Sequence, residues 1–333
     1  MAATSPNIMG NPMKLITLTF LLLAGFMLGL GQGAMGPGLI EDAFAGNEQA
    51  QMILVEYRLP RLLAALFIGA GLGMSGACLQ GVTRNPLADH SLLGMSGFAA
   101  LFCVVSFYLF SQQNSLMLFL VSFAGAGFAM MLVYVAVGKG AVDSTKLILM
   151  GLALNAMASA LIALTLNLAP NPFAGFEALR WLLGSLDGIG LQDLPIIATC
   201  SLLGLLLLSM TGKGLNLLSL GPDEAISLGL RGRGFILLII LGSGLIIASG
   251  VAAAGVVGFV GIIAPHIARA FWGALPSTLL WPSALIGAII TLTADQLVMA
   301  LDQQIPLQLG VVTGLIGAPF FIYLIGKGHR SWS

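Results

Sequence analysis

Ionisable side chains inside apolar stretches could do chemistry in this sequence, because in a membrane protein they line paths for ions or protons. Few are present: Asp295 lies near one end of a long apolar segment, Asp302 lies just beyond it, and Asn155 is polar but neutral. A charge at mid-bilayer costs about 2.5–3.5 kcal/mol on insertion scales, so it persists mainly where it functions. The scarcity argues against transport driven by an ion gradient. An ion-coupled secondary transporter is kept as the alternative function.

Sequence patterns for hydrolysis, nucleotide binding and metal binding are absent from the 333 residues. There is no Walker A motif, no HExxH and no GxSxG. Cys78, Cys103 and Cys200 lie in apolar runs without CxxC spacing, which is typical of small packing residues. His266 could be a proton relay or a metal ligand, but an isolated His at a helix end is more often an interfacial hydrogen-bonding residue. We predict no catalytic residue, no metal and no cofactor, and energy supplied by an ion gradient or by another subunit.

Two arginines, Arg58 and Arg61, stand at the start of an apolar segment. At a spacing of three they share one helical face. They could dock an acidic partner protein. They could equally extend toward lipid phosphates while burying their aliphatic stems, and the sequence leaves both alternatives open.

The composition places these residues in a membrane protein. Of the chain, 58% is hydrophobic and 8% is charged, whereas roughly a quarter of a soluble domain is charged. The formal net charge is zero, so no attraction for nucleic acid is predicted. The apolar runs are continuous, without the alternation of a transmembrane β-barrel. The predicted fold class is therefore an all-α polytopic membrane protein.

An α-helical span needs about 20 apolar residues. Ten apolar segments separated by polar breaks satisfy this requirement approximately, of which the eighth is short and contains Pro265. They predict spans near 14–34, 59–81, 92–110, 115–137, 146–168, 193–211, 234–252, 255–271, 277–297 and 307–326.

Basic residues set the orientation, because cytoplasmic loops are enriched in Lys and Arg. With the N-terminus in the cytoplasm, only Arg58, Arg61 and Arg180 of the 13 basic residues fall outside. Ten spans return the C-terminus to the cytoplasm. The prediction is a multi-pass membrane protein with both termini in the cytoplasm.

Residues 1–12 are interpreted as a disordered cytoplasmic leader. The first apolar segment could be a secretory signal peptide, but the many spans that follow favour a first membrane span. Residues 13–330 then form a single transmembrane domain.

The longest cytoplasmic connection, residues 211–233, contains a predicted short helix over about 222–228. Pro222 suits the first turn of a helix, and Asp223 and Glu224 favour its positive end. Gly229 is placed to end it. A simple connector could be shorter. A capped helix at the membrane surface therefore suggests a docking element for a cytoplasmic protein, although a connector without a partner is the alternative.

The segment after residue 254 contains three glycines at a spacing of three, Gly255, Gly258 and Gly261. In one continuous helix they would form a stripe for close helix packing. Pro265 and His266 are expected to break that helix near the cytoplasmic side.

Five long motifs, in order, resemble those of bacterial ABC-importer permeases for iron chelates, haem and cobalamin, the FecCD-like type II importers. The resemblance covers nearly the whole chain. The motifs are YRLPRLLAALFIGAGLGMSGACLQGVTRNPLADHSLLGMSGFAAL (57–101), WLLGSLDG (181–188), LSLGPDEAISLGL (218–230), GVVGFVGIIAPHIAR (255–269) and GVVTGLIGAPFFIYLI (310–325).

The resemblance implies a ten-span permease of the bacterial inner membrane. It would work as a dimer, with an identical copy or with a paralogue. Two cytoplasmic ATPase subunits would bind beneath it, and a periplasmic or lipid-anchored binding protein would deliver substrate. The chain itself would be no enzyme. A ferric siderophore is the expected cargo, with haem or cobalamin as alternatives, moved from periplasm to cytoplasm by alternating access.

The resemblance also suggests roles for particular residues. Arg58, Arg61 and Arg180 are expected to dock the binding protein, Ser144 and Thr145 to form the cytoplasmic gate, and Asn155 to lie near the translocation path. The residues expected to contact the ATPase are Leu220, Gly221, Pro222, Asp223, Glu224, Ala225, Leu228, Gly229, Arg84, Asn85 and Pro86.

One outer loop departs from the family pattern. Many relatives have ELPVG preceded by an Arg, whereas this chain has PLQLG at 306–310 and Met299 at the matching position. A second basic contact to the binding protein is therefore not expected at that loop.

Overall fold

The computed structural model describes residues 12–31, 38–91, 93–109, 114–137, 144–230, 232–301 and 307–327. Within these ranges all regular structure is helical, which confirms the predicted all-α class. α1 begins at Pro12, so the last residue of the predicted leader is helical, while residues 1–11 lie outside the described residues. Asp302 lies outside them as well.

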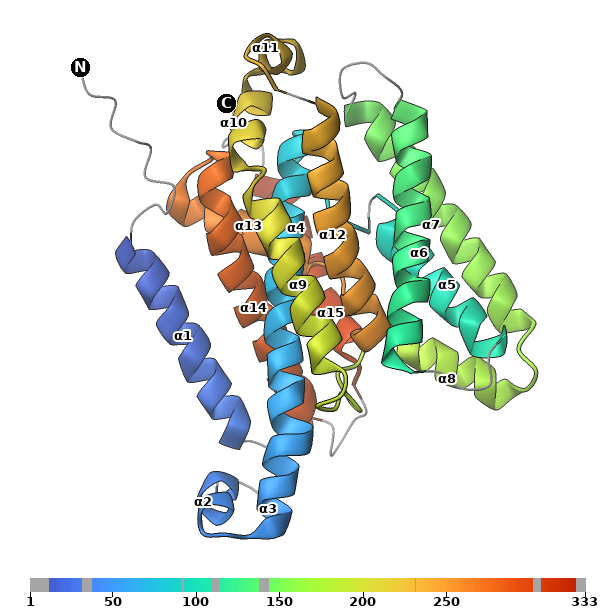
Figure 1. Ribbon diagram of the computed structural model, residues 1–333, viewed down its shortest axis with the longest axis vertical. Helices are drawn as coiled ribbons and strands as arrows, with labels where there is room; N and C mark the ends of the chain where they lie inside the picture. Colours follow the sequence, from blue (N-terminus) through green and yellow to red (C-terminus); the bar gives the residue numbers. More distant parts are fainter. Residues whose placement is uncertain are drawn as a thin grey trace.

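The long helices lie close to the predicted apolar segments, although the helix in the segment 255–271 begins only at Val260 (Figure 1). In chain order they are α1 (Pro12–Gly31), α4 (Leu59–Thr83), α5 (Met95–Leu109), α6 (Ser115–Val137), α7 (Ser144–Asn167), α9 (Leu194–Ser209), α12 (Gly232–Ala254), α13 (Val260–Trp272), α14 (Pro276–Leu301) and α15 (Leu309–Lys327).

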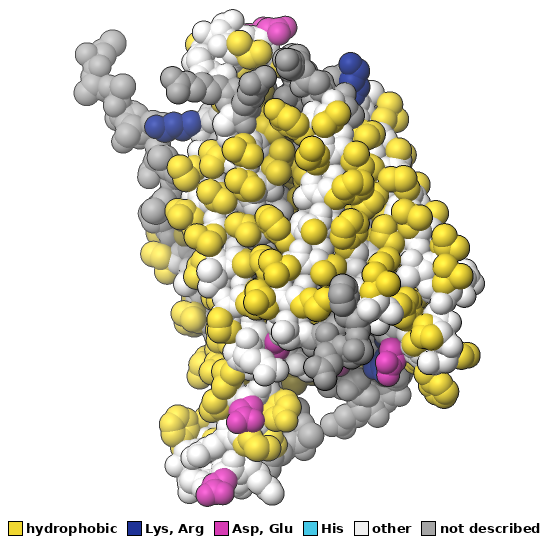
Figure 2. Space-filling view, turned by 45° about the vertical axis from the view of Figure 1, so that its right-hand side comes forward, with side chains coloured by type: hydrophobic (Ala, Val, Ile, Leu, Met, Phe, Trp, Pro, Cys, Tyr) yellow, Lys and Arg dark blue, Asp and Glu magenta, His cyan; other side chains and the backbone are white. Residues whose placement is uncertain are grey.

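Six helices in the described ranges are long and apolar enough to cross a membrane, and α9 with the bent continuation α10 (Gly212–Leu220) could form a seventh span. α5 and α15 are apolar but shorter. The membrane character is confirmed, and the number of ten spans stays a prediction. Figure 2 shows hydrophobic side chains covering the middle of one face of the molecule, with charged side chains toward the two ends.

Six further helices are short. α2 (Leu39–Phe44), α3 (Glu48–Met52) and the π-helix η1 (Ile53–Arg58) project beyond one end of the bundle and lead into α4 (Figure 1). α8 (Pro172–Leu182) follows α7, and α10 and α11 (Pro222–Ser227) follow α9. The predicted connection over 211–233 is thus mostly helical.

α4 is the central helix and packs against α14, α9, α13 and α12. Gly69 and Gly73 of α4 face Ser283 and Gly287 of α14 so closely that a Cβ on Gly69 would lie 2.5 Å from the Gly287 carbonyl oxygen. This backbone-to-backbone approach is the small-residue packing typical of membrane helices.

The predictions for the segment after residue 254 were wrong in two respects. Residues 255–259 are not helical, so Gly255 and Gly258 form no helical stripe with Gly261. Pro265 lies inside α13 and does not break it. A proline removes the N–H that would bond the carbonyl four residues earlier, here that of Gly261. Gln80 Nε2 of α4 donates to this oxygen instead, at 3.2 Å.

Candidate functional site

α11 lies at one end of the molecule (Figure 1), and side chains in and next to it form a small exposed surface. Leu220, Ile226 and Leu228 expose 63%, 57% and 59% of their surface, and Asp223 and Glu224 are exposed beside them. We call these five residues the α11 surface. Exposed apolar side chains beside carboxylates at the end of a bundle are typical of a protein-docking site.

Local sequence holds the α11 surface in place. Gly221 has a φ of 135°, which a residue with a side chain rarely adopts, and it ends α10 and starts α11 in one step. Pro222 occupies the first turn, and Gly229 follows the helix with a φ of 90°, as the sequence predicts. The helix ends at Ser227, one residue before the predicted end. Ala225 is fully buried and anchors it.

Residues 81–83 are the last residues of α4, and residues 84–90 form the turn that follows. Arg84 is exposed with a left-handed φ of 49°, and the Asn85 side chain accepts from Leu87 N at 3.0 Å. Pro86 is half-buried. Asp89 and His90, in contrast, are 1% exposed and form an internal pair at 3.0 Å. Of this turn, only the part formed by Arg84, Asn85 and Pro86 is therefore accessible to a partner protein.

The two arginines at the opposite end of α4 have partners inside the chain. Arg58 is buried and donates to the Leu30 carbonyl oxygen at 3.2 Å. Arg61 donates through Nε and Nη2 to both oxygens of Asp295, at 2.8–3.0 Å, and through Nη1 to Asp187. Asp295 is fully buried, whereas the Asp187 side chain is 52% exposed.

The structure therefore gives Arg61 a role that the sequence did not suggest, since a buried carboxylate requires a hydrogen-bonded counter-charge. Of the two carboxylates that pair with Arg61, only that of Asp187 is exposed to solvent. Arg180 differs from the other two arginines: it is exposed in the last turn of α8. Docking of a binding protein by these arginines stays a prediction.

The three residues expected at the gate and path lie on α7. Ser144 begins the helix, and Thr145 is exposed. Asn155 is half-buried at the contact with α5, where a Cβ on Gly97 would lie 2.9 Å from Asn155 Oδ1. The gate at α7 and the path near Asn155 remain predictions.

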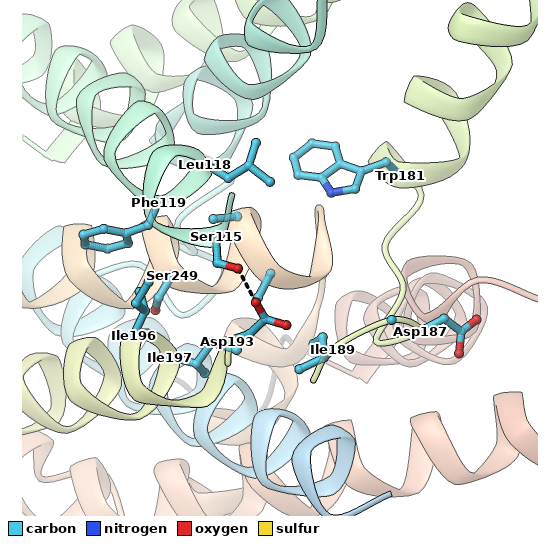
Figure 3. Close-up of a pocket in the computed structure, with 13 residues that line it drawn as sticks. Ser115, Leu118, Phe119, Trp181, Asp187, Ile189, Asp193, Ile196, Ile197 and Ser249 are labelled. Carbon is cyan, nitrogen blue, oxygen red and sulfur yellow. Dashed lines mark hydrogen bonds between the residues drawn. The ribbon is translucent and has the colours of Figure 1, made fainter. Parts of the chain in front are cut away.

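A cavity of about 230 Å³ lies between α6, α9, α12 and the loop 183–193 (Figure 3). Trp181 lines one side, and the Asp193 carboxylate faces the interior, accepting from Ser115 Oγ of α6 and, at 2.8 Å, from Gly190 N. Sequence reasoning assigned no role to these residues, although Trp181 and Asp187 fall within one of the five motifs. Within the described ranges, no cluster of His, Cys, Asp or Glu is arranged to hold a metal.

Comparisons with known proteins give a consistent result. The model of the FecCD transport family matches residues 16–327. The Fe(3+) dicitrate transport system permease protein FecD of Escherichia coli is 35% identical, covering 93% of this chain and 97% of that protein. The Fe(3+)-citrate import system permease protein YfmD of Bacillus subtilis is 34% identical (96% and 96%), and the hemin transport system permease protein HmuU of Yersinia pestis is 33% identical (95% and 97%).

One solved structure, described as an inward-facing conformation of a metal-chelate type ABC transporter, superposes with a TM-score of 0.86 at 31% identity. The match covers 95% of this chain and 100% of that chain.

Proposed function

This chain belongs to the FecCD transport family and is a multi-pass permease of an ABC importer for iron chelates, and from that premise we propose that it moves a ferric siderophore inward by alternating access. A separate ATPase subunit supplies the energy. The chain acts as a dimer, with a second copy or a paralogue, so that the path lies between two permease subunits.

The α11 surface is the observation that supports the ATPase-driven part of this proposal. It offers apolar contacts and two carboxylates on a rigid, capped helix at one end of the bundle. A groove on a cytoplasmic ATPase with an apolar floor and a basic rim would complement it. Closure of the ATPase pair on ATP would then push α11, and Arg84, Asn85 and Pro86 at the end of α4 would support the same contact.

A periplasmic or lipid-anchored binding protein delivers the cargo at the Arg61 end. Arg180 is the best candidate for docking an acidic side chain of that protein, because it is exposed. Arg58 and Arg61 contribute less, since their guanidinium groups already have internal partners. Ser144 and Thr145 serve as the cytoplasmic gate, and Asn155 lies near the path.

The alternative, an ion-coupled transporter, is less well supported by the geometry. The Asp295 carboxylate, buried in a long apolar helix, is paired bidentately with Arg61 and so is poorly suited to bind and release a proton.

Reconstitution decides between the two functions. The permease is placed in proteoliposomes with its ATPase and binding protein, and uptake of ⁵⁵Fe-loaded ferric hydroxamate, ferric citrate and haem is measured. ATP-dependent uptake of the hydroxamate complex is expected. Uptake by the permease alone on a proton or sodium gradient would refute the proposal. Preference for citrate or haem would refute the siderophore assignment only.

A further inference from the structure

Helices α4 and α14 form a pair that must move together. Gly73 has no room for a side chain against Ser283 of α14, and Gly287 has none against Gly69 of α4. Because the two backbones touch, sliding one helix along the other would bring main-chain atoms into collision, and packed interfaces of this kind do not deform continuously. We call these two helices the α4–α14 pair.

One end of the α4–α14 pair is hydrogen-bonded to α10, the helix that precedes α11. Asn216 of α10 donates through Nδ2 to Ser277 Oγ at 2.8 Å and accepts from Ser277 N at 2.9 Å through Oδ1. Ser277 N is one of the first-turn N–H groups of α14 that has no partner within the helix. Gly212 packs on the same serine, since its Cβ would lie 3.2 Å from Ser277 Cβ.

The opposite end of the α4–α14 pair is joined to the loop 183–193 by an ion pair. Ser277 and Asp295 are eighteen residues apart on α14, or about 27 Å along the helix. There Arg61 joins Asp295 of α14 to Asp187 of the loop 183–193. The Asp187 contact is the adjustable one, because that carboxylate is half-exposed while Asp295 is fully buried.

The loop 183–193 is hydrogen-bonded to α15 and α6. Leu309 N and Gly310 N at the start of α15 donate to Gly184 O and Leu183 O at 2.8 and 3.0 Å. Asp193 accepts from Ser115 of α6 across the cavity in Figure 3. A displacement of the loop would therefore reach α6, α15 and the cavity together.

We propose that Asn216 is a positioning residue that makes the α4–α14 pair follow α11, and that the Arg61–Asp187 contact passes this movement to the loop 183–193. This rests on the proposed function, in which α11 is moved by the ATPase. The α4–α14 pair then links the docking surface at one end of the protein to the cavity at the other.

The test uses the complete transporter with its ATPase in lipid nanodiscs. Spin labels are placed on L191C in the loop and L120C on α6, both exposed positions, while the three native cysteines are buried. The distance between the labels is measured without nucleotide and with ATP and vanadate, and ATP hydrolysis is measured in parallel.

In the unmodified protein the nucleotide shifts the distance. With Asn216→Ala, the fraction of molecules in the shifted state falls about tenfold, the factor expected for losing a hydrogen-bonded contact, while ATP hydrolysis continues. Asn216→Asp, whose carboxylate can accept from both Ser277 groups, restores the shift. Ser219→Ala, whose hydroxyl bonds the main-chain carbonyl of Asn216 and not Ser277, leaves the shift unchanged.

Asp187→Ala removes the acceptor of Arg61 Nη1 and is expected to lower the shifted fraction in the same direction as Asn216→Ala. The double variant should be no worse than the worse single variant, because the two contacts act in series. A normal shift in folded Asn216→Ala, or additive losses in the double variant, would overturn the inference. Failure of the unmodified permease to bind the ATPase would instead refute the proposed function.

Discussion

The Arg61–Asp295 pair allows a quantitative test of how this bundle is held together. Asp295 is fully buried and accepts three hydrogen bonds from Arg61 at 2.8–3.0 Å. Replacing Arg61 by Leu removes the only ion-pair partner that Asp295 has among the described residues. A buried charge deprived of its partner costs about 3–5 kcal/mol, whereas losing the half-exposed Asp187 contact should cost about 0.2–1 kcal/mol.

The stability of the purified permease is measured by SDS titration or steric trapping in lipid. We expect Arg61→Leu to lower the free energy of unfolding by about 3–5 kcal/mol and Asp187→Asn by less than about 1 kcal/mol. In the double variant Arg61→Leu with Asp295→Leu no charge is left unpaired, so most of the loss is recovered. Equal losses for Arg61→Leu and Asp187→Asn, or additive losses in the double variant, would refute this account of a buried ion pair.

Three further outcomes are expected. Gly73→Ala should destabilise the protein by about 1–3 kcal/mol through overpacking. Gly127→Ala should be neutral or slightly stabilising in the same titration, because an added Cβ there would meet no atom outside its own stretch of helix within 4 Å. Charge reversal of Asp223 and Glu224 should weaken co-purification of the ATPase or uncouple hydrolysis from uptake, with membrane insertion unchanged; normal uptake would exclude the coupling role. Gln80→Leu should cost about 1–3 kcal/mol, because it leaves the Gly261 carbonyl of α13 without this donor and removes the acceptor of Arg269 Nη2. A neutral result would refute the role given to Gln80 in α13.

The sequence determined approximately where most of the long helices begin and end, because apolar runs and local breakers act within a few residues. It did not predict α2, α3, α8 and α10. Pro222, Gly221 and Gly229 define α11 by their own backbone preferences, so that helix was predictable to within one residue. Membrane character followed from composition alone, since few charges remain to be solvated. The family motifs then pointed to the transport class.

Only the tertiary structure decided which charges meet. Arg61 and Asp295 are 234 residues apart in the sequence, and Gln80 bonds a carbonyl 181 residues away. A local sequence pattern could therefore predict neither contact. The same long-range packing let α13 continue through Pro265, because the freed carbonyl found a donor on another helix. Local sequence sets the backbone of each segment, whereas the partner of a buried polar group depends on which helices the fold brings together.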